Sequence, residues 1–422
     1  MSWGVYANYK AVAGINWPQR IPAHWEVEKL GHLALLRSGG NITSEEIEEA
    51  GQYPVYGGNG RRGYTDRYTH DGEFVLIGRQ GALCGNINYA TGRFWASEHA
   101  VVVKPLRCFA TKWMGELLRA TNLNQYSVSA AQPGLAVATI SALRIPVPPL
   151  DEQRTIADFL DRETAAIGAL IAKKTRFIEL LNEKRQALVT HTVTKGLDPN
   201  VKMKDSGEKW LEEIPAQWDV VPSNRFFVES KKRAHEEDEH LSATQKYGVI
   251  PLAEFERLEG RQVTHAEKNL EQRKHVEVDD FVISMRSFEG GIERVKARGC
   301  VRSSYVALVA DERAHVGFFS YLFKSSAYIQ GLQATAMFIR DGQDLNYNNF
   351  RQVKLPFPST DEQSRIAEFL DREISKSSAL LAKTEEAINK LLEYRSALIS
   401  AAVTGEIDVR NYRPQEAAVL CQ

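Results

Sequence analysis

The chemistry that this sequence offers most clearly is hydrogen bonding by arginine and amide side chains in a glycine-rich loop. The stretch Tyr53-Pro-Val-Tyr-Gly-Gly-Asn-Gly-Arg-Arg-Gly-Tyr64 places Asn59 close to the pair Arg61 and Arg62. Glycines let backbone amides approach phosphates, and Arg and Asn side chains can read base edges. We therefore expect Asn59, Arg61, Arg62 and Tyr64 to contact DNA, with a plain solvent-exposed hairpin loop as the alternative. No Gly-Lys-Ser/Thr follows, so a nucleotide-binding P-loop is not indicated.

Further polar residues follow predicted strands or stand near the end of a variable segment. Leu76-Ile-Gly-Arg79 and Val282-Ile-Ser-Met-Arg286 are alike, because each is a strand that delivers an arginine at its end. Their side chains suit direct readout of bases, although such residues are also ordinary loop formers, and the basic stretch around residue 294 also fits a solvated charged hairpin. The further candidates for DNA contact are Arg79, Gln80, Gln132, Arg286, Ser287, Arg340, Gln343 and Asn346.

Motifs of catalysis do not accompany these residues. The sequence has no Asn/Asp-Pro-Pro-Tyr/Phe motif of adenine methyltransferases, no Walker A or helicase motif, and no nuclease-type carboxylate cluster. The histidines lack ligand or triad spacing, and the scattered cysteines Cys84, Cys108, Cys300 and Cys421 form no metal-ligand pattern. We predict no catalytic residue, no cofactor and no metal site.

The composition is that of a globular protein, with 43% hydrophobic and 25% charged residues. No run approaches the roughly 18 to 20 apolar residues of a membrane-spanning helix, and residues 1–10 do not resemble a signal peptide, so we expect a cytoplasmic protein without a membrane partner. The formal net charge of −1 would not by itself suggest DNA binding, since DNA-binding proteins gain affinity from phosphate neutralisation and are often clearly basic.

An internal repeat organises the chain. Residues 151–163 (Asp-Glu-Gln-Arg-Thr-Ile-Ala-Asp-Phe-Leu-Asp-Arg-Glu) return 210 residues later as residues 361–373, with ten of thirteen positions identical. The match continues weakly, without a gap, to Val403-Thr404. A second repeated element, Trp-x3-Ile-Pro-Ala-x-Trp, begins at Trp17 and again at Trp210. The chain is therefore a tandem duplication.

Both copies of the longer repeat are predicted to be helices of about 43 residues, or roughly 64 Å. Alternating steps of four and three residues trace an apolar stripe of coiled-coil type in each copy. Prolines precede both stripes, and Gly196 and Gly405 lie just past their ends. Such stripes could serve oligomerisation, but two matching stripes in one chain can also satisfy each other. The expected packing residues are Ile156, Leu160, Leu170, Leu181, Leu188, Ile366, Leu370, Leu380, Leu391 and Leu398.

Residues 27–150 and 219–360, which lie between the repeated elements, do not align convincingly with each other. Both segments have mixed α/β character. We predict strands at residues 73–78, 100–104, 280–285 and 305–309, and helices at 114–123 and 318–329. A protein that reads two different targets in the same geometry would keep the repeated elements constant and vary the segments between them.

The duplicated Trp-x3-Ile-Pro-x-x-Trp and Glu-Gln-x-x-Ile-Ala-x-Phe-Leu-Asp motifs resemble those of the specificity subunit of type I restriction-modification systems, over nearly the whole chain. The resemblance implies an α+β fold: two mixed α/β target-recognition domains joined by two long helices packed as an antiparallel coiled coil, in a pseudo-two-fold tandem repeat. The implied layout is residues 1–150 for the N-terminal segment and first domain, 151–198 for a spacer helix, 199–218 for a linker, 219–360 for the second domain, 361–404 for the second spacer helix and 405–422 for a tail.

The resemblance also implies the function and the partners. Each domain would grip one half of a bipartite double-stranded DNA site, and the paired helices would act as a molecular ruler. The partners would be two copies of an N6-adenine methyltransferase subunit, with or without two copies of an ATP-driven restriction subunit. Those methyltransferases could supply much of the phosphate contact that the near-neutral chain lacks. The alternatives from the residues alone are a helical scaffold that binds proteins and a nuclease that uses the acidic residues.

Overall fold

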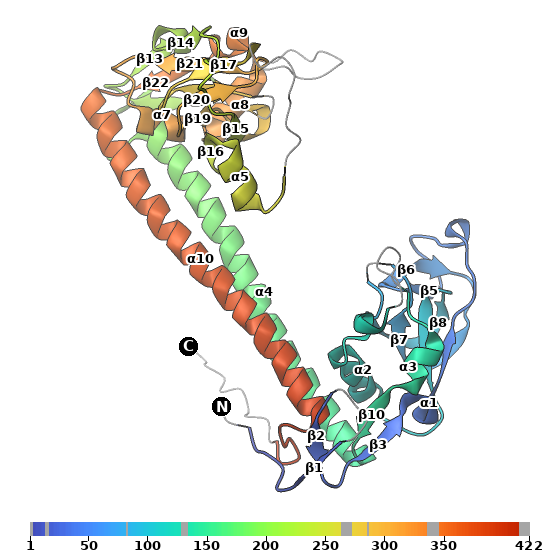
Figure 1. Ribbon diagram of the computed structural model, residues 1–422. Coiled ribbons are helices and arrows are strands. Elements are labelled where there is room, and N and C mark those ends of the chain that lie inside the picture. The colour runs from blue at the N-terminus through green and yellow to red at the C-terminus, as the bar shows by residue number, and fades with distance from the viewer. Residues whose placement is uncertain are drawn as a thin grey trace. The chain divides into compact units, whose positions relative to one another are not determined.

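The chain folds into two compact units, shown in the computed structural model of Figure 1. Unit 1 comprises Met1–Lys174 and Glu385–Gln422, and unit 2 comprises Thr175–Thr384. Each unit contains one sheet-based domain and part of both long helices, α4 (Leu150–Lys195) and α10 (Thr360–Thr404). The structure describes residues 3–12, 17–81, 83–127, 134–262, 272–284, 287–335 and 346–412.

Unit 1 is built on a six-stranded sheet in the order β4-β9-β7-β8-β5-β6, in which only the β5–β8 pair is parallel. The sheet curls, because Gly40, just after β4, pairs with Ser97, just after β8. Helix α2 (Thr111–Ala120) packs against β7 and β8 through buried Trp113, Met114 and Leu117. The strands are β4 (Ala34–Ser38), β5 (Tyr53–Gly57), β6 (Gly60–Thr65), β7 (His70–Gly78), β8 (Ile87–Ala96) and β9 (Ala100–Pro105).

Unit 2 repeats the first four strand positions of this sheet. Its central sheet has the order β14-β21-β18-β19, and every neighbouring pair is antiparallel, as in β4-β9-β7-β8. The two variable segments therefore share a strand arrangement that their sequences do not reveal. The strands and hairpins here are β14 (Phe227–Ser230), β15 (Leu241–Thr244), β16 (Gly248–Pro251), β17 (Lys274–Val276), β18 (Phe281–Ile283), β19 (Glu293–Arg294), β20 (Gly299–Val301) and β21 (Val306–Ala310).

The chain enters and leaves each domain through one antiparallel ribbon. Strand β3 (Glu26–Lys29) pairs with β10 (Arg144–Val147), and β13 (Asp219–Pro222) pairs with β22 (Lys354–Phe357). A short hairpin precedes each ribbon: β1 (Tyr9–Ala11) with β2 (Arg20–Pro22), and β11 (Met203–Asp205) with β12 (Glu213–Pro215). The small helices are α1 (Leu30–Leu33), η1 (Ser44–Glu46), η2 (Leu123–Tyr126), α3 (Val137–Ala142), η3 (Ser223–Arg225), α5 (Leu252–Glu259), α6 (Ser287–Gly290), α7 (Val316–Leu322), α8 (Ser326–Ala334) and α9 (Tyr347–Phe350).

The four strands expected from the sequence are β7, β9, β18 and β21, and the expected helix at 114–123 lies over α2. The helix expected at 318–329 is instead two helices, α7 and α8. The break has a local cause: the hydroxyl of Ser325 accepts a hydrogen bond from the backbone N–H of Tyr328 and so caps a new helix.

The repeated glutamine of each long helix joins that helix to its own domain. The side chain of Gln153 donates to Pro148 O (2.9 Å) and accepts from the backbone N–H of Ala110, the N-cap of α2 (3.0 Å). In unit 2, Gln363 donates to Pro358 O (2.9 Å) and accepts from the N–H of His315, the N-cap of α7 (2.7 Å). We call each of these arrangements a glutamine clamp.

Other residues of the same motif complete the contact between helix and domain. Asp161 pairs with Lys112 of α2 at 2.9 Å, and its repeat equivalent Asp371 accepts from Tyr321 of α7 at 2.6 Å. Ile156 and Ile366 are fully buried in the cores of their units. The two copies of the motif are alike because each copy attaches a long helix to its own domain.

The second repeated motif receives the end of a long helix. Trp25 and Trp218 are both fully buried. The residue that follows α10, Gly405, has φ +74° and lies so close to Pro22 that a Cβ atom there would be 2.5 Å from the proline ring. Gly196, which follows α4 with φ +82°, faces the second copy of the motif less tightly, since a Cβ atom there would lie 3.4 Å from Trp218. The two glycines expected past the helix ends are thus required by left-handed backbone.

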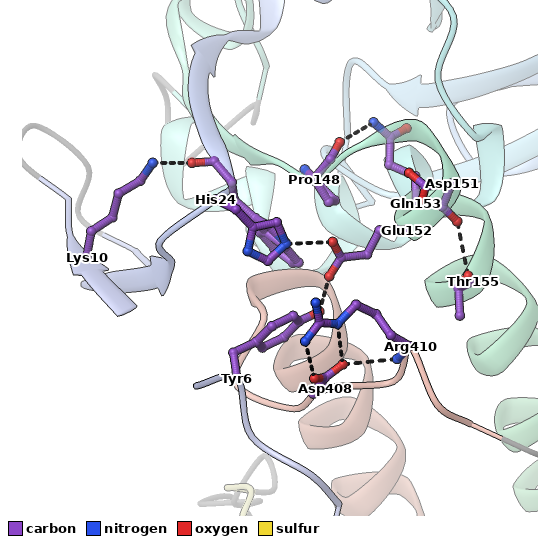
Figure 2. Close-up of polar contacts among 11 residues, drawn as sticks. Tyr6, Lys10, His24, Pro148, Asp151, Glu152, Gln153, Thr155, Asp408 and Arg410 are labelled. Carbon is purple, nitrogen blue, oxygen red and sulfur yellow. Dashed lines mark hydrogen bonds and ion pairs between the residues drawn. The ribbon is translucent and has the colours of Figure 1, made fainter. Parts of the chain in front are cut away.

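In unit 1, residues from both ends of the sequence meet at the start of α4 (Figure 2). Buried Glu152 accepts from the hydroxyl of Tyr6 and lies 2.8 Å from His24 Nε2. The backbone N–H of Asp408 donates to Gly4 O, and the Asp408 carboxylate binds Arg410. These contacts hold residues 4–9 and 405–410 together.

The two long helices run antiparallel within each unit. In unit 1, Ile156 and Leu160 from the start of α4 share a core with Leu398 and Val403 from the end of α10. In unit 2, Val193 from the end of α4 shares a core with Ile366, Leu370 and Ile374 from the start of α10. Half-buried Leu391 packs against the core of unit 1, and half-buried Leu188 packs against the core of unit 2. Leu181 is also half-buried.

The expected packing stripe is wrong at Leu170 and Leu380, which are each 43% exposed. A strict seven-residue pattern drifts around a straight helix of 3.6 residues per turn, whereas eleven residues complete almost three full turns. The buried positions of α4 follow the longer spacing: Ile156, Ile167 and Val189 are 0, 7 and 9% exposed. The heptad positions Leu170 and Leu380 therefore lie on a second, uncovered apolar face of the long helices.

We expect the substitution Gln153→Ala to destabilise unit 1, because it removes the partner of the half-buried Ala110 N–H and of the buried Pro148 O. Each unsatisfied buried group costs about 1 to 3 kcal/mol. Gln363→Ala should destabilise unit 2 by a similar amount. The measurement is urea unfolding followed by tryptophan fluorescence, with exposed Asn389→Ala as the control. Unfolding midpoints of the glutamine variants equal to that of Asn389→Ala would show that the clamps contribute nothing.

Candidate nucleic-acid interface

The glycine-rich loop of unit 1 forms the β5–β6 hairpin, with Gly58 and Asn59 as its turn. Strand β6 lies at the edge of the sheet and carries Arg61 and Arg62, which are both exposed. The Arg61 guanidinium donates to the Tyr64 hydroxyl at 2.8 Å and lies 5.2 Å from the centre of that ring. This contact holds the Arg61 cation in a fixed place, whereas the aliphatic part of the Arg62 side chain lies against Gly57.

The hairpin turn meets two further loops. A Cβ atom on Gly58 would lie 3.2 Å from His99 O and 3.7 Å from Gln80 O, so only a very small residue fits comfortably there. The side chain of Asn86 donates to Asn59 Oδ1 at 3.0 Å. The backbone N–H of Arg79 donates to His99 O at 2.9 Å. The structure thus brings the candidates Asn59, Arg79 and Gln80 together beside the turn.

Of these candidates, Asn59 and Gln80 are exposed. The backbone of Gln80 forms a bridge with Gly134. The guanidinium of Arg79 is half-buried and donates to Ser38 Oγ at 3.0 Å, which fixes its direction. Asn86 and His99 are polar neighbours that sequence reasoning missed. Only strand pairing brings them to the turn, so no sequence motif marks them.

The equivalent residues of unit 2 are placed differently. Ser287 is 1% exposed, and its hydroxyl accepts from the backbone N–H of Ser284 at 2.9 Å, which is a structural contact. Asn346 caps α9, since its side chain accepts from the N–H groups of Asn348 and Asn349. Four further candidates lie outside the described residues, namely Gln132, Arg286, Arg340 and Gln343.

A buried histidine fixes the loop before β15 in unit 2. His275 of β17 is 3% exposed; its Nδ1 lies 2.7 Å from Asp238 Oδ2 and its Nε2 lies 3.0 Å from Glu277 Oε1. Both ring nitrogens can donate only when the imidazole is protonated. Burial lowers the pKa of His275, but the hydrogen bonds to Asp238 and Glu277 outweigh it and raise this pKa above its usual value. The same contacts with His275 help to lower the pKa of both carboxyls.

Within the described ranges, no three His, Cys, Asp or Glu side chains are placed to share a metal ion. Cys84, Cys108 and Cys300 are free, and Cys421 lies outside the described residues. No helix in the described part of the chain is long and apolar enough to span a membrane.

Comparison with known proteins shows which family part of the chain resembles. Residues 22–180, which hold the curled sheet of unit 1, match the family described as "Type I restriction modification DNA specificity domain". This part of the chain is therefore similar to type I DNA specificity domains. It is 47% identical over 137 residues to the Escherichia coli type I restriction enzyme EcoprrI specificity subunit, a match that covers 32% of this chain and 34% of the relative. The chain therefore spans about a third of the length of that curated relative.

Longer but weaker matches extend the likeness. The putative specificity subunit MjaX of Methanocaldococcus jannaschii is 26% identical over 314 residues, which cover 72% of this chain and 67% of that protein. A solved chain of a type I R-M system has a TM-score of 0.67 at 16% identity and covers 92% of this chain and 100% of its own length. The HsdS subunit from Thermoanaerobacter tengcongensis gives 0.51 at 16% identity, over 93% and 100% of the two chains. These findings confirm the resemblance to specificity subunits and the α+β fold class.

We expect unit 2 to lose stability as pH rises. A raised folded pKa means that the contribution of His275 is fully present below its unfolded value of about 6.5 and is lost as pH rises through the higher folded value. Urea unfolding across this pH range should show the decline in the parent and not in His275→Gln. Exposed His32→Gln is the control. An equal pH dependence in all three proteins would contradict a charged His275.

Proposed function

We propose that this chain is the specificity subunit of a type I restriction-modification complex. In this proposal each unit carries one target-recognition domain, the two domains read the two halves of a bipartite double-stranded DNA site, and the long helices set the distance between the halves. The chain directs partner adenine methyltransferase subunits, and restriction subunits where the system has them. It contributes no catalytic residue itself, and it works in the cytoplasm.

The observation that carries this proposal is the duplicated frame around different domains. Each domain is attached by one two-stranded ribbon and one glutamine clamp, while its loops differ from those of the other domain. A constant attachment with variable loops suits a protein that must present two different reading surfaces in one geometry. Residues 27–150 and 219–360 are the proposed domain boundaries.

The exposed edge of the β5–β6 hairpin supports DNA contact by the first domain. A two-stranded β-ribbon can enter the major groove, where Arg side chains bind guanine and Asn side chains bind adenine. Arg61, Arg62, Asn59 and Gln80 are suitably exposed or lie beside the turn. Arg286 and Arg340 remain the proposed readers of the second domain.

The uncovered face of the long helices supports docking of helical partners. Leu170 and Leu380 occupy equivalent positions of the repeat and are equally exposed, at 43%. Because the repeat presents the face twice, we propose that two methyltransferase subunits bind, one at each copy.

The experiment that tests the function is exchange of one domain. Replacing residues 27–150 by the corresponding segment of another family member should change one half of the methylated target and leave the other half unchanged. The measurement is genome-wide mapping of methylated adenines in cells that also contain the methyltransferase subunit. The proposal fails if both halves change together, or if the parent directs no methylation at all.

We expect Arg61→Ala and Arg62→Ala to weaken DNA binding in one of two recognisable ways. Loss of a base contact should cost about 1 to 3 kcal/mol and relax one position of the target, whereas loss of a phosphate contact should weaken all sequences and reduce the salt slope by about one. Binding is measured on the assembled complex by fluorescence anisotropy at several salt concentrations. Exposed Arg144→Ala is the control. If both variants bind as this control does, the hairpin is not part of the interface.

We expect Leu170→Asp and Leu380→Asp each to reduce the number of bound methyltransferase subunits from two to one. Burial of one leucine contributes about 1.5 to 3 kcal/mol, and a buried charge would oppose binding further. Stoichiometry is read by native mass spectrometry. Leu258→Asp, on α5 and also 43% exposed, is the matched control. Full assembly of the double variant would place the docking face elsewhere.

A further inference from the structure

Unit 2 contains a large groove that the proposed function does not use. Its volume is about 1030 Å³, and its walls come from α4, the β15–β16 turn, the stretch from α6 to β19, α7, α8 and α10. All of its lining residues belong to unit 2, so the groove is a feature of one folded body. We call it the unit 2 groove.

The lining of the groove includes a buried carboxyl group, one oxygen of which has no hydrogen-bond partner among the described residues. The Glu293 side chain is 3% exposed. One of its oxygens binds Lys324 Nζ, whereas Oε2 has no hydrogen-bond partner among the described residues. The same Lys324 ammonium also donates to Gly290 O at 3.0 Å. A buried polar atom without a partner is rare in folded proteins and calls for an explanation.

Cations outnumber carboxylates along the lining, and two of the cations are uncompensated. Across the described ranges, Arg185 of α4 and Lys296 after β19 have no carboxylate within ion-pair distance. Lys324 pairs with Glu293, and Arg294 pairs with Asp279 at 2.6 Å. The five cations of the lining are Arg185, Lys246, Arg294, Lys296 and Lys324, against Glu289, Glu293 and Asp371.

The neutral part of the lining supplies hydrogen-bond donors. Amide side chains line the groove from three separate elements: Asn182 and Gln186 on α4, Gln245 in the β15–β16 turn and Gln330 on α8. Each NH₂ group offers two donors. A ligand that only accepts hydrogen bonds and carries negative charge matches both the amides and the uncompensated cations. Phosphate has this chemistry, because its oxygens are strong acceptors.

We propose that the unit 2 groove binds phosphate groups, carried either by a free nucleotide or by a strand of nucleic acid. Arg185 on α4 and Lys296 after β19 hold the phosphate, and the amides of α4 and α8 donate to its remaining oxygens. This site goes beyond the proposed function, which assigns target reading in unit 2 to other residues, and it does not depend on that function.

Glu293 is suited to such a ligand because its charge is easily removed. Burial raises its pKa to about 7, although Lys324 opposes this shift. The charged neighbours on the surrounding elements are Lys324 between α7 and α8, Arg294 on β19, Lys296 after β19, Arg185 on α4, Lys246 in the β15–β16 turn, Glu289 on α6 and Asp371 on α10. When Glu293 takes up a proton, the groove loses a negative charge. The O–H of the protonated Glu293 carboxyl group can then donate to a phosphate oxygen.

The test is calorimetric titration of the full chain with ATP, with adenosine and with a short oligothymidylate. The parent should bind a phosphate-bearing probe and not adenosine. The double variant Arg185→Ala with Lys296→Ala should bind it at least about tenfold more weakly, as expected for lost charge-assisted hydrogen bonds. The matched control is Arg351→Ala with Lys383→Ala, which removes two exposed cations of unit 2 outside the groove.

The probes separate the two sources of phosphate. Saturable binding of ATP that is weakened in the double variant supports a free nucleotide, and the same pattern for oligothymidylate alone supports a nucleic acid strand. Glu293→Gln should bind more tightly than the parent at about pH 8 and equally at about pH 6. The proposal is overturned if no phosphate-bearing probe binds, or if the double variant binds as its control does. Normal duplex recognition by the double variant would leave the proposed function intact.

Discussion

The placement of the loops of both domains depends on a buried glutamine side chain that joins each domain to a long helix. Gln153 and Gln363 each donate to a proline carbonyl at the exit of a ribbon and accept from the N-cap N–H of a domain helix. A carboxylate could not donate and an ammonium could not accept, so the amide fits both ends of the clamp. Because both partners are backbone atoms, the clamp sets no condition on the domain's own side chains. The loops of each domain are free to differ as long as these backbone groups stay in place.

This difference between shared attachments and variable loops explains which parts of the structure could be predicted from the sequence. The clamp, the buried isoleucines and the tryptophan motifs recur because they contact parts that both units share, and the internal repeat reveals them directly. Strands such as β9, with Val101, Val102 and Val103, are predictable because they are buried apolar runs. The common strand order of the two sheets leaves no such mark, since it results from pairing between segments far apart in the chain.

The helix stripe and the hairpin turn show two physical limits of such predictions. A heptad and an eleven-residue pattern share Ile156 and Ile167 and diverge only at Leu170, so one sequence fits both until burial distinguishes them. At the turn, Gly58 approaches residues of two other loops that its sequence neighbours do not specify. Side chains such as Asn86 become candidates only through this approach. Site residues that depend on strand pairing are therefore the last to be found from sequence.

The net charge of −1 is compatible with a DNA-binding role because the charges are distributed unevenly. Most acidic side chains of the long helices are exposed and several pair with neighbours one turn away, as Glu386 does with Lys390. Such pairs cancel locally and contribute little field at a distance. Arg61 and Arg62 on β6 and Arg185 and Lys296 in the unit 2 groove have no carboxylate within ion-pair distance among the described residues. The attraction that a nucleic acid would feel depends on these uncompensated cations and not on the sum over the chain, so a neutral total can coexist with two separate positive surfaces.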